Sequence, residues 1–384
     1  YDFLLSAFRH PRITVTAVGD DKQRIMVWAG ARRDAIARFK ADFTAEKIPL
    51  VFNFRSSADL VRIQHVVAQA LDTNAIPTIA KADRKVDGDV AQVWNCPTEA
   101  AEAQQIANWL AADMARRNTS ARDYALLVRQ TADRFEEQLE GPLASVGLRV
   151  RNESHVLGRM SLQDLLVEEF TAIGVALLRL GATRRATTAW QTASAAVQRL
   201  RTADPEDEVA CVRAEEGLMA FLTNLRTTMA ATPPDAAAAQ SLTDQILTFA
   251  DRAALASAYL EYGTGDNLAI AIEAFRLHLA ACTEGATDWS GCLDRFEGVG
   301  QVPLMTVHKS KGLEYDTILF VGLDDKMWWS HTPENPEGLA TFFVALSRAK
   351  QRAIFTFCRA RGTRTRVADL YQLLTTAGVP EVSY

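Results

Sequence analysis

The stretch LMTVHKSKGLEYDTILFVGL, residues 304–323, decides how this chain folds, because two buried-strand patterns flank a short polar connection. The runs VPLMTV (302–307) and DTILFVGL (316–323) are almost entirely apolar, while the residues between them include a histidine, two lysines, a glycine and a glutamate. The stretch predicts neighbouring strands of one sheet with polar side chains where the strands end.

Strand and helix patterns alternate on both sides of this stretch, which indicates a parallel α/β sheet. Strands are expected at 13–18, 48–52, 89–96, 123–129, 148–152, 302–307, 316–323 and 353–358. Helices are expected at 1–10, 98–117, 133–147 and 342–349.

Between residues 161 and 296 the chain becomes rich in alanine and almost loses its strand signal. Ser161 is expected to cap one helix and Asp204, before Pro205, another, and a single helix is expected over 241–262. We therefore predict that a helical insertion interrupts one α/β domain. The predicted bounds are 44–155 with 300–384 for that domain, 156–299 for the insertion, and 1–43 for the tail of a preceding domain.

Composition excludes few functions. The net charge of −5 means that any nucleic-acid site must be a local groove, because the chain as a whole does not attract polyanions. No apolar run is long enough to span a bilayer, and no signal peptide is recognisable. Five cysteines without metal-ligand spacing favour reduced thiols, so we expect a cytoplasmic protein with no metal ligands in this chain.

Polar residues next to the strand patterns are candidates for a ligand site, since α/β folds bind ligands beyond the carboxyl ends of parallel strands. Arg55 and Arg348 suit a phosphate, because a guanidinium offers paired donors in a fixed geometry. Gly312 lets the backbone approach a ligand closely, and Glu314 is a candidate acceptor for a ribose hydroxyl. Each has a structural alternative: an arginine at a strand end is often ion-paired, and a loop glycine often only makes a turn.

Five segments, in order, carry more weight than any single residue. They are GDDKQRIMVWAGA (19–31), NFRS (53–56), LLVR (126–129), TVHKSKGLEY (306–315) and FFVALSRA (342–349). Together they resemble motifs of UvrD/Rep/PcrA-type superfamily 1 DNA helicases, whose patterns read roughly GDxxQSIYxWRGA, NYRS, VLYR, TxHxxKGLEF and FYVxxTRA. The resemblance covers about 1–155 and 300–360, which corresponds to the C-terminal portion of such a helicase.

The resemblance implies a RecA-like, P-loop-NTPase-type parallel sheet domain interrupted by an all-helical insertion subdomain. Such helicases hydrolyse ATP, with Mg²⁺, between two RecA-like domains and move 3'-5' along single-stranded DNA or into a junction with duplex. The implied partners are therefore ATP, DNA and the N-terminal RecA-like domain, with no membrane.

The resemblance also implies roles for single residues. Gln23, Arg55 and Arg348 would act on the γ-phosphate as catalytic residues, Phe54 would stack on adenine, and Glu314 would bind the ribose beside Gly312. The residues assigned to DNA are Trp28, which would stack on a base, and Arg129, Thr306 and His308, which would contact the backbone.

This sequence also departs from the family. The phosphate-binding motif GxxxxGK[ST] and the acidic DExQD-type motif that holds Mg²⁺ are absent, so we expect both, and the Mg²⁺ ligands, upstream of Tyr1. The chain alone is then expected neither to hydrolyse ATP nor to unwind DNA. Met26 and Ala29 stand where tyrosine and arginine are usual, and this is expected to weaken DNA contact at that segment.

Three other interpretations remain open from the sequence. The chain could be a non-enzymatic DNA- or partner-binding module that has lost its ATPase half, although Gln23, Arg55, Glu314 and Arg348 would then serve no nucleotide. It could belong to a helicase–nuclease, but no spaced nuclease cluster follows residue 360. An unrelated metabolite-binding α/β enzyme would require the order of the five segments to be accidental.

Overall fold

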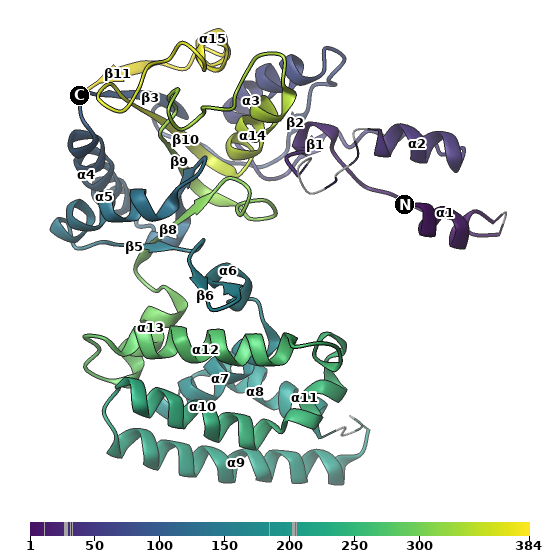
Figure 1. The fold of residues 1–384 in the computed structure, drawn as a ribbon, viewed down its shortest axis with the longest axis vertical. Coiled ribbons are helices and arrows are strands. Elements are labelled where there is room, and N and C mark those ends of the chain that lie inside the picture. Colours follow the sequence, from purple (N-terminus) through teal and green to yellow (C-terminus); the bar gives the residue numbers. More distant parts are fainter. Residues whose placement is uncertain are drawn as a thin grey trace. The chain divides into compact units, whose positions relative to one another are not determined.

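The computed structural model describes residues 1–10, 12–26, 30, 32, 34–183, 185–201, 204 and 206–384. Contacts divide the chain into two compact units (Figure 1): Tyr1–Val150 with Val302–Tyr384, called here the sheet unit, and Arg151–Gln301, the helical unit. Residues 1–43 are grouped with the sheet unit, and their assignment to a separate preceding domain stays a prediction.

The sheet unit is built on seven strands in the order β11-β3-β10-β9-β4-β8-β5. Every pairing from β11 through to β8 is parallel, so the mixed α/β fold expected from the sequence is confirmed. The strands are β3 (Ala91–Cys96), β4 (Tyr124–Val128), β5 (Arg149–Asn152), β8 (Gln301–Thr306), β9 (Tyr315–Val321), β10 (Ala349–Cys358) and β11 (Glu381–Ser383).

Helices pack against this sheet because its central strands are apolar on both faces. All five residues of β4 are buried, as are all but one in β9. Two pairs of helices cover them (Figure 1): α4 (Glu99–Arg117) packs on α5 (Ala132–Ser145), and α3 (Ala58–Leu71) packs on α14 (Pro336–Leu346). The Thr98 side chain accepts a hydrogen bond from the Ala101 N–H and caps α4, as its sequence predicts.

The connection between β8 and β9, residues 307–314, is called here the crossover segment. Strand β4 lies between β8 and β9 and is parallel to both, so the crossover segment must run from the carboxyl edge of the sheet back to its amino edge. Gly312 lies in this segment with a φ of +93°, a conformation that L side chains rarely adopt. One short loop therefore joins the two edges.

Shorter elements complete the sheet unit. They are α1 (Asp2–Phe8), η1 (Asp21–Gln23), α2 (Ala35–Asp42), β1 (Phe52–Asn53), β2 (Ile79–Ala80), η3 (Ala121–Asp123) and α15 (Ala368–Thr376). Strand β1 pairs with β2 in a separate two-stranded sheet.

Three predictions for the sheet unit are wrong in their bounds. Residues 13–18 form no strand, because an apolar alternating run becomes a strand only when another strand offers its backbone groups. The strand expected at 48–52 is reduced to β1 for the same reason. The helix expected at 342–349 begins at Pro336 and ends at Leu346, so Arg348 lies in the turn that leads into β10 and not on a helix.

The helical unit packs its helices around one apolar core that includes Phe170, Phe275 and Phe296. Its helices are α6 (Leu162–Leu165), α7 (Glu169–Ala182), α8 (Thr187–Leu200), α9 (Glu208–Ala231), α10 (Ala236–Ala250), α11 (Arg252–Ala258), η4 (Leu260–Gly263), α12 (Asn267–Thr283) and α13 (Trp289–Glu297). The unit is not entirely helical, because β6 (Val156–Leu157) and β7 (Met160–Ser161) form a short antiparallel hairpin.

Helix boundaries in this unit differ from the predicted ones in two places. Asp207, and not Asp204, caps α9 by accepting a hydrogen bond from the Ala210 N–H. The single helix expected over 241–262 is broken at Asp251, whose φ is +68° and whose carboxylate caps α11. Ser161 caps α6 as predicted. Local capping by aspartate therefore decides where these helices begin.

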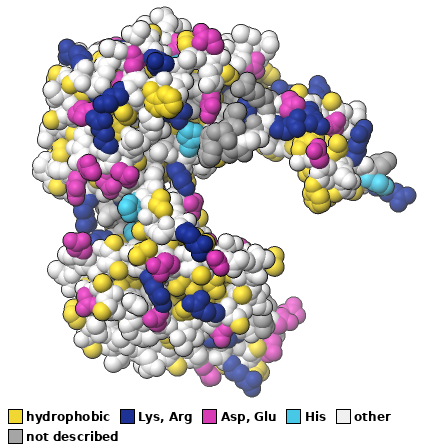
Figure 2. Space-filling model, viewed as in Figure 1, with side chains coloured by type: hydrophobic (Ala, Val, Ile, Leu, Met, Phe, Trp, Pro, Cys, Tyr) yellow, Lys and Arg dark blue, Asp and Glu magenta, His cyan; other side chains and the backbone are white. Residues whose placement is uncertain are grey.

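No helix in the described ranges is long and apolar enough to cross a membrane. Figure 2 shows basic and acidic side chains interspersed over the visible face of both units, in keeping with the small net charge. Any site for a polyanion on this face is therefore local.

The pH dependence of stability tests the core of the helical unit. His278 is buried against Phe296, and burial lowers its pKa to about 4. The unfolded chain, with an ordinary histidine pKa of about 6.5, binds the proton more readily, so stability should rise from pH 4 to about 6.5 and then level off. Urea unfolding at several pH values should show that His278→Gln reduces this slope by at most about 1.4 kcal/mol per pH unit. Equal slopes in the two proteins would contradict the assignment.

A glycine substitution tests the crossover segment. No atom lies within 4 Å of a Cβ added at Gly312, so Gly312→Ala should destabilise only through its backbone conformation, by about 1 kcal/mol. Gly217, in the middle of α9, has equally open space and no positive φ, so Gly217→Ala should stabilise by about 0.5–1 kcal/mol. Thermal unfolding of both variants measures the difference, and a neutral or stabilising Gly312→Ala would show that the left-handed conformation is not required.

Candidate functional site

The turn NFRS is shaped by Asn53. Its side-chain oxygen accepts hydrogen bonds from the N–H groups of Arg55 (2.8 Å) and Ser56 (2.9 Å), a local arrangement typical of asparagine in turns. Ser56 Oγ then donates to the Ala349 carbonyl at 2.8 Å, at the start of β10. The turn therefore holds Arg55 beside the amino end of that strand.

Five side chains meet at the amino ends of β9 and β10, and we call them the amino-edge cluster. They are Gln23, Arg55, Glu314, Arg348 and Lys350. Glu314 directly precedes β9 and Arg348 directly precedes β10, and the Tyr315 N–H donates to the Arg348 carbonyl at 2.9 Å. Arg55 Nε lies 2.5 Å from one Glu314 carboxylate oxygen, and Lys350 Nζ lies 2.9 Å from the other.

Arg348 is buried, with only 2% of the residue exposed, yet the hydrogen bonds of its guanidinium go to neutral acceptors. It donates to the carbonyls of Val344 (3.1 Å) and Leu313 (3.2 Å), to Gln23 Oε1 (3.2 Å) and to Ser347 Oγ (2.7 Å). Burial, and then the charge of Arg55, lower the pKa of Arg348 to about 10. The cluster thus concentrates positive charge around a group shielded from water.

Other buried arginines of the chain differ from Arg348 in this respect. Arg352 lies 3.0 Å from Asp113, Arg361 lies 2.6 Å from both Glu102 and Asp324, and Arg151 lies 2.8 Å from Glu153. In the ranges that the structure describes, no carboxylate lies within ion-pair distance of Arg348, and the charge of Glu314 acts on it only from farther away. A buried cation without a counter-ion is costly by several kcal/mol, so a site of this kind is suited to an anionic ligand.

Glu314 is the one acid of the amino-edge cluster, and it is ionised. Hydrogen bonds from Lys350 and then from Arg55 lower the pKa of its carboxyl group. Its side chain and that of Arg55 remain 40% and 35% exposed. The carboxylate is therefore accessible to a ligand but already shared between two cations.

Gln23 links the GDDKQ turn to both the cluster and the crossover segment. Its side chain accepts from Arg348 and donates to Asp20 at 3.1 Å, while its carbonyl accepts from Lys311 Nζ at 3.1 Å. Asp20 in turn caps η1 by accepting from the Lys22 N–H. A movement of Gln23 would therefore change its contacts with both Arg348 and Lys311 of the crossover segment.

Phe54 directly precedes Arg55, and Gly312 lies two residues before Glu314. Phe54 is 71% exposed, and its ring packs edge-on against that of Phe52, which is itself half exposed. An exposed aromatic ring next to an arginine is suited to stacking on a base. Gly312 precedes Glu314 by two residues and sets the turn that delivers it.

Residues assigned to DNA lie at the opposite, carboxyl edge. Thr306 ends β8, Arg129 follows β4, and the Arg129 guanidinium lies 3.5 Å from His308 Nδ1. Burial, and then the charge of Arg129, lower the pKa of His308. The three side chains form a basic, polar group next to one another along this edge.

One further aromatic residue on the carboxyl edge was not identified from the sequence. Trp329 follows β9, is 63% exposed and donates from Nε1 to Gln130 Oε1 at 3.2 Å, directly after Arg129. It lines an open cavity of about 750 Å³ together with His331 and Arg366. The available signal was the pair Trp328-Trp329, of which Trp328 is buried and Trp329 is exposed.

The placement at two edges corrects the prediction that all of these residues lie beyond the carboxyl ends of strands. Glu314 and Arg348 stand before the amino ends of β9 and β10, whereas Thr306 and Arg129 stand at carboxyl ends. The short crossover segment causes the difference, because it carries the chain across the sheet between His308 and Glu314.

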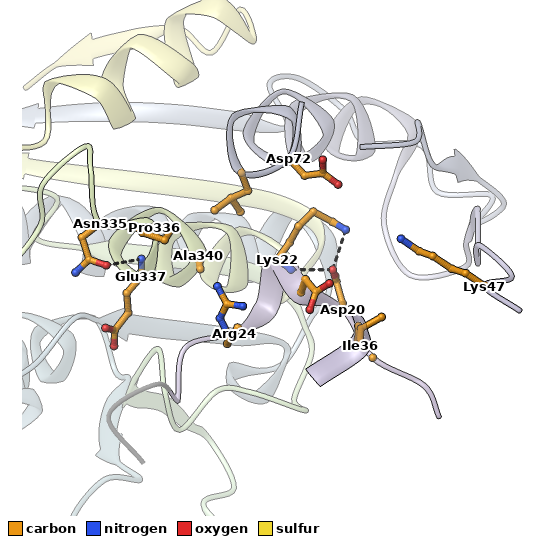
Figure 3. A pocket seen from close by; sticks show the side chains of 13 residues that line it. Asp20, Lys22, Arg24, Ile36, Lys47, Asp72, Asn335, Pro336, Glu337 and Ala340 are labelled. Atoms are coloured by element: carbon orange, nitrogen blue, oxygen red, sulfur yellow. Dashed lines mark hydrogen bonds and ion pairs between the residues drawn. The ribbon is translucent and has the colours of Figure 1, made fainter. Parts of the chain in front are cut away.

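A second cavity, of about 360 Å³, lies between the GDDKQ turn and the start of α14 (Figure 3). Acidic Asp20, Asp21, Asp72 and Glu337 line it, along with basic Lys22, Arg24 and Lys47. In Figure 3, Lys22 points toward Asp20, and the Asn335 side chain accepts from the Glu337 N–H to cap α14. This cavity lacks the excess of positive charge that a phosphate requires, and Arg55, Glu314 and Arg348 do not line it.

The structure does not test the expected contact of residues 28 and 29 with DNA. Trp28 and Ala29 lie outside the described residues, so their predicted relation to DNA stays a prediction. Among the described residues, no group of three or more His, Cys, Asp or Glu side chains could hold a metal ion.

Comparison with known proteins finds similarity to DNA helicases. The model of the UvrD-like helicase C-terminal domain matches residues 288–360. DNA helicase II of Haemophilus influenzae is 25% identical over 399 aligned residues, which cover 90% of this chain and 52% of that protein. The ATP-dependent DNA helicase Rep of Buchnera aphidicola is 30% identical over 156 residues, covering 39% of this chain and 23% of that protein.

The chain thus spans about half the length of the first of these relatives. The matched domain contains the crossover segment, Glu314 and Arg348, which the amino-edge cluster brings together. By these comparisons, the chain is similar to the C-terminal portion of UvrD/Rep-type DNA helicases.

Proposed function

We propose that this chain is the C-terminal part of an ATP-dependent 3'-5' DNA helicase or translocase, and that its sheet unit is the second RecA-like domain. ATP would bind at the amino edge of the sheet, against an N-terminal RecA-like domain, and single-stranded DNA would run along the carboxyl edge. A cytoplasmic location belongs to the same proposal.

The observation that carries the proposal is the buried guanidinium of Arg348. Among the described residues, the three other buried arginines, Arg151, Arg352 and Arg361, pair with carboxylates, whereas Arg348 is held by neutral acceptors and has Arg55 nearby. Such an arrangement stabilises negative charge that arrives from outside, as a γ-phosphate does in phosphoryl transfer.

The other cluster residues then have defined roles. Arg55 and Arg348 would stabilise charge on the transferred phosphoryl group, and Gln23 would report its presence to Arg348 and the crossover segment. Glu314 would accept a ribose hydroxyl and Phe54 would stack on the adenine. Mg²⁺ would be held outside this chain, because the phosphate-binding and acidic motifs are absent from its sequence.

The crossover segment would couple nucleotide binding to movement along DNA. It begins directly after Thr306 and includes His308, both proposed DNA contacts, and its last residue is Glu314. A shift of this one loop on nucleotide binding would move groups at both edges of the sheet. Trp329 would add a base-stacking platform on the DNA side.

A non-enzymatic DNA- or partner-binding module remains the second candidate, favoured by the missing phosphate-binding motif. It leaves the buried charge of Arg348 without a ligand, which is why we prefer the first proposal.

Hydrolysis by the full-length product of the native gene decides between these two. We expect ATP hydrolysis that single-stranded DNA stimulates, and no hydrolysis by residues 1–384 alone. Arg348→Lys keeps the charge but loses the planar fork, so kcat should fall about 10²–10³-fold. The matched control is Arg352→Lys, which alters a buried arginine that is paired with Asp113, and its kcat should change little.

Absence of hydrolysis by the native product would favour the binding module. Equal losses in the two lysine variants, with equal loss of folded protein, would instead show that Arg348 is only structural.

DNA binding tests the carboxyl edge separately. Trp329→Ala should weaken binding of single-stranded DNA about 5- to 150-fold, because stacking on an aromatic ring contributes roughly 1–3 kcal/mol per base. Trp329→Phe keeps a stacking face and should retain most of the affinity. Fluorescence anisotropy with a labelled oligonucleotide measures both affinities. Unchanged affinity in Trp329→Ala would show that Trp329 does not contact DNA.

A further inference from the structure

Lys350 is a cation of the amino-edge cluster that the resemblance to helicases does not explain. It is the second residue of β10, and its backbone carbonyl accepts from the Ser57 N–H at 2.9 Å, so its position is fixed by the sheet and by the start of α3. Its Nζ binds one oxygen of Glu314 while Arg55 binds the other. The same carboxylate therefore has one partner on a strand and one on a loop.

These two partners differ in how readily they can leave. The Arg55–Glu314 pair is over one third exposed, and ion pairs of that kind contribute little to stability. A phosphate offers Arg55 more charge and a bidentate geometry, so it competes well with a single carboxylate. The Lys350–Glu314 pair is also partly exposed, with side chains 27% and 40% exposed, but a lysine lacks the paired donors of a guanidinium, so Lys350 gains less than Arg55 by exchanging Glu314 for a phosphate.

We propose that Lys350 is a positioning residue that makes ribose recognition by Glu314 depend on the γ-phosphate; this rests on the function proposed above. When the γ-phosphate arrives, Arg55 exchanges Glu314 for phosphate, and one carboxylate oxygen becomes free for a ribose hydroxyl. Lys350 holds the other oxygen and keeps the carboxylate ionised and in place. With a diphosphate, Arg55 stays bound to Glu314, and the ribose hydroxyls interact only weakly with that carboxylate.

The exchange predicts that ribose hydroxyls matter more in a triphosphate than in a diphosphate. The test uses the full-length DNA-stimulated enzyme. It compares KM for ATP and 2',3'-dideoxy-ATP with the inhibition constants of ADP and 2',3'-dideoxy-ADP. Removal of the hydroxyls should weaken the triphosphate about three- to tenfold more than the diphosphate.

Variants at Lys350 isolate its part. Lys350→Met should bring the two penalties within about twofold of each other, with a larger change in KM than in kcat, and Lys350→Arg should restore the difference. Lys85→Met removes the charge of an exposed lysine outside the cluster, and it should behave as the wild type.

Three results would overturn the proposal. Equal ribose penalties for tri- and diphosphate in the wild type would show that Arg55 does not exchange. An unchanged difference in Lys350→Met would show that Lys350 does not position Glu314. No hydrolysis by the wild type would reject the proposed function itself, and the exchange with it, which distinguishes that failure from the first two.

Discussion

The buried charge of Arg348 is the constraint on which the amino edge of the sheet depends. The side chain sits where α14 ends and β10 begins, and it is satisfied by carbonyls from α14 and the crossover segment and by Gln23. Three separate parts of the chain are therefore fixed to one guanidinium. Because none of these acceptors carries a charge, the cation keeps its attraction for an anion, which a carboxylate partner would have cancelled.

The strand order of the parallel sheet determines at which edge of the sheet an anion would meet Arg348. Strands β8 and β9 are consecutive in the chain but are separated by β4 in the sheet, so their connection must cross from one edge to the other. As a result, the residues just after β8 face one set of partners and those just before β9 face another. A longer, helical crossover would place several turns between the two groups, whereas here only a few residues join His308 to Glu314.

Much of this could be predicted from the sequence. Apolar runs such as residues 316–323 identified the central strands, because burial on both faces leaves little room for polar side chains. The cap at Thr98 and the helical character of residues 161–296 were also predictable, since both depend on local patterns. Residues 13–18 were not, because their strand-like pattern has no partner, and Arg348 was placed on a helix because the apolar run of α14 continues up to it.

By itself, the sequence determined the α/β class, the helical insertion and the identities of Arg55, Glu314 and Arg348 as candidates, since these rest on short-range patterns and on ordered motifs. Only the tertiary structure decided which candidates meet. It brought Arg55 to Glu314 across more than 250 residues, added Lys350 to the cluster, and separated Thr306 and His308 onto the other edge. The physical reason is that strand order and the direction of a crossover are set by packing between distant segments, which no local pattern encodes.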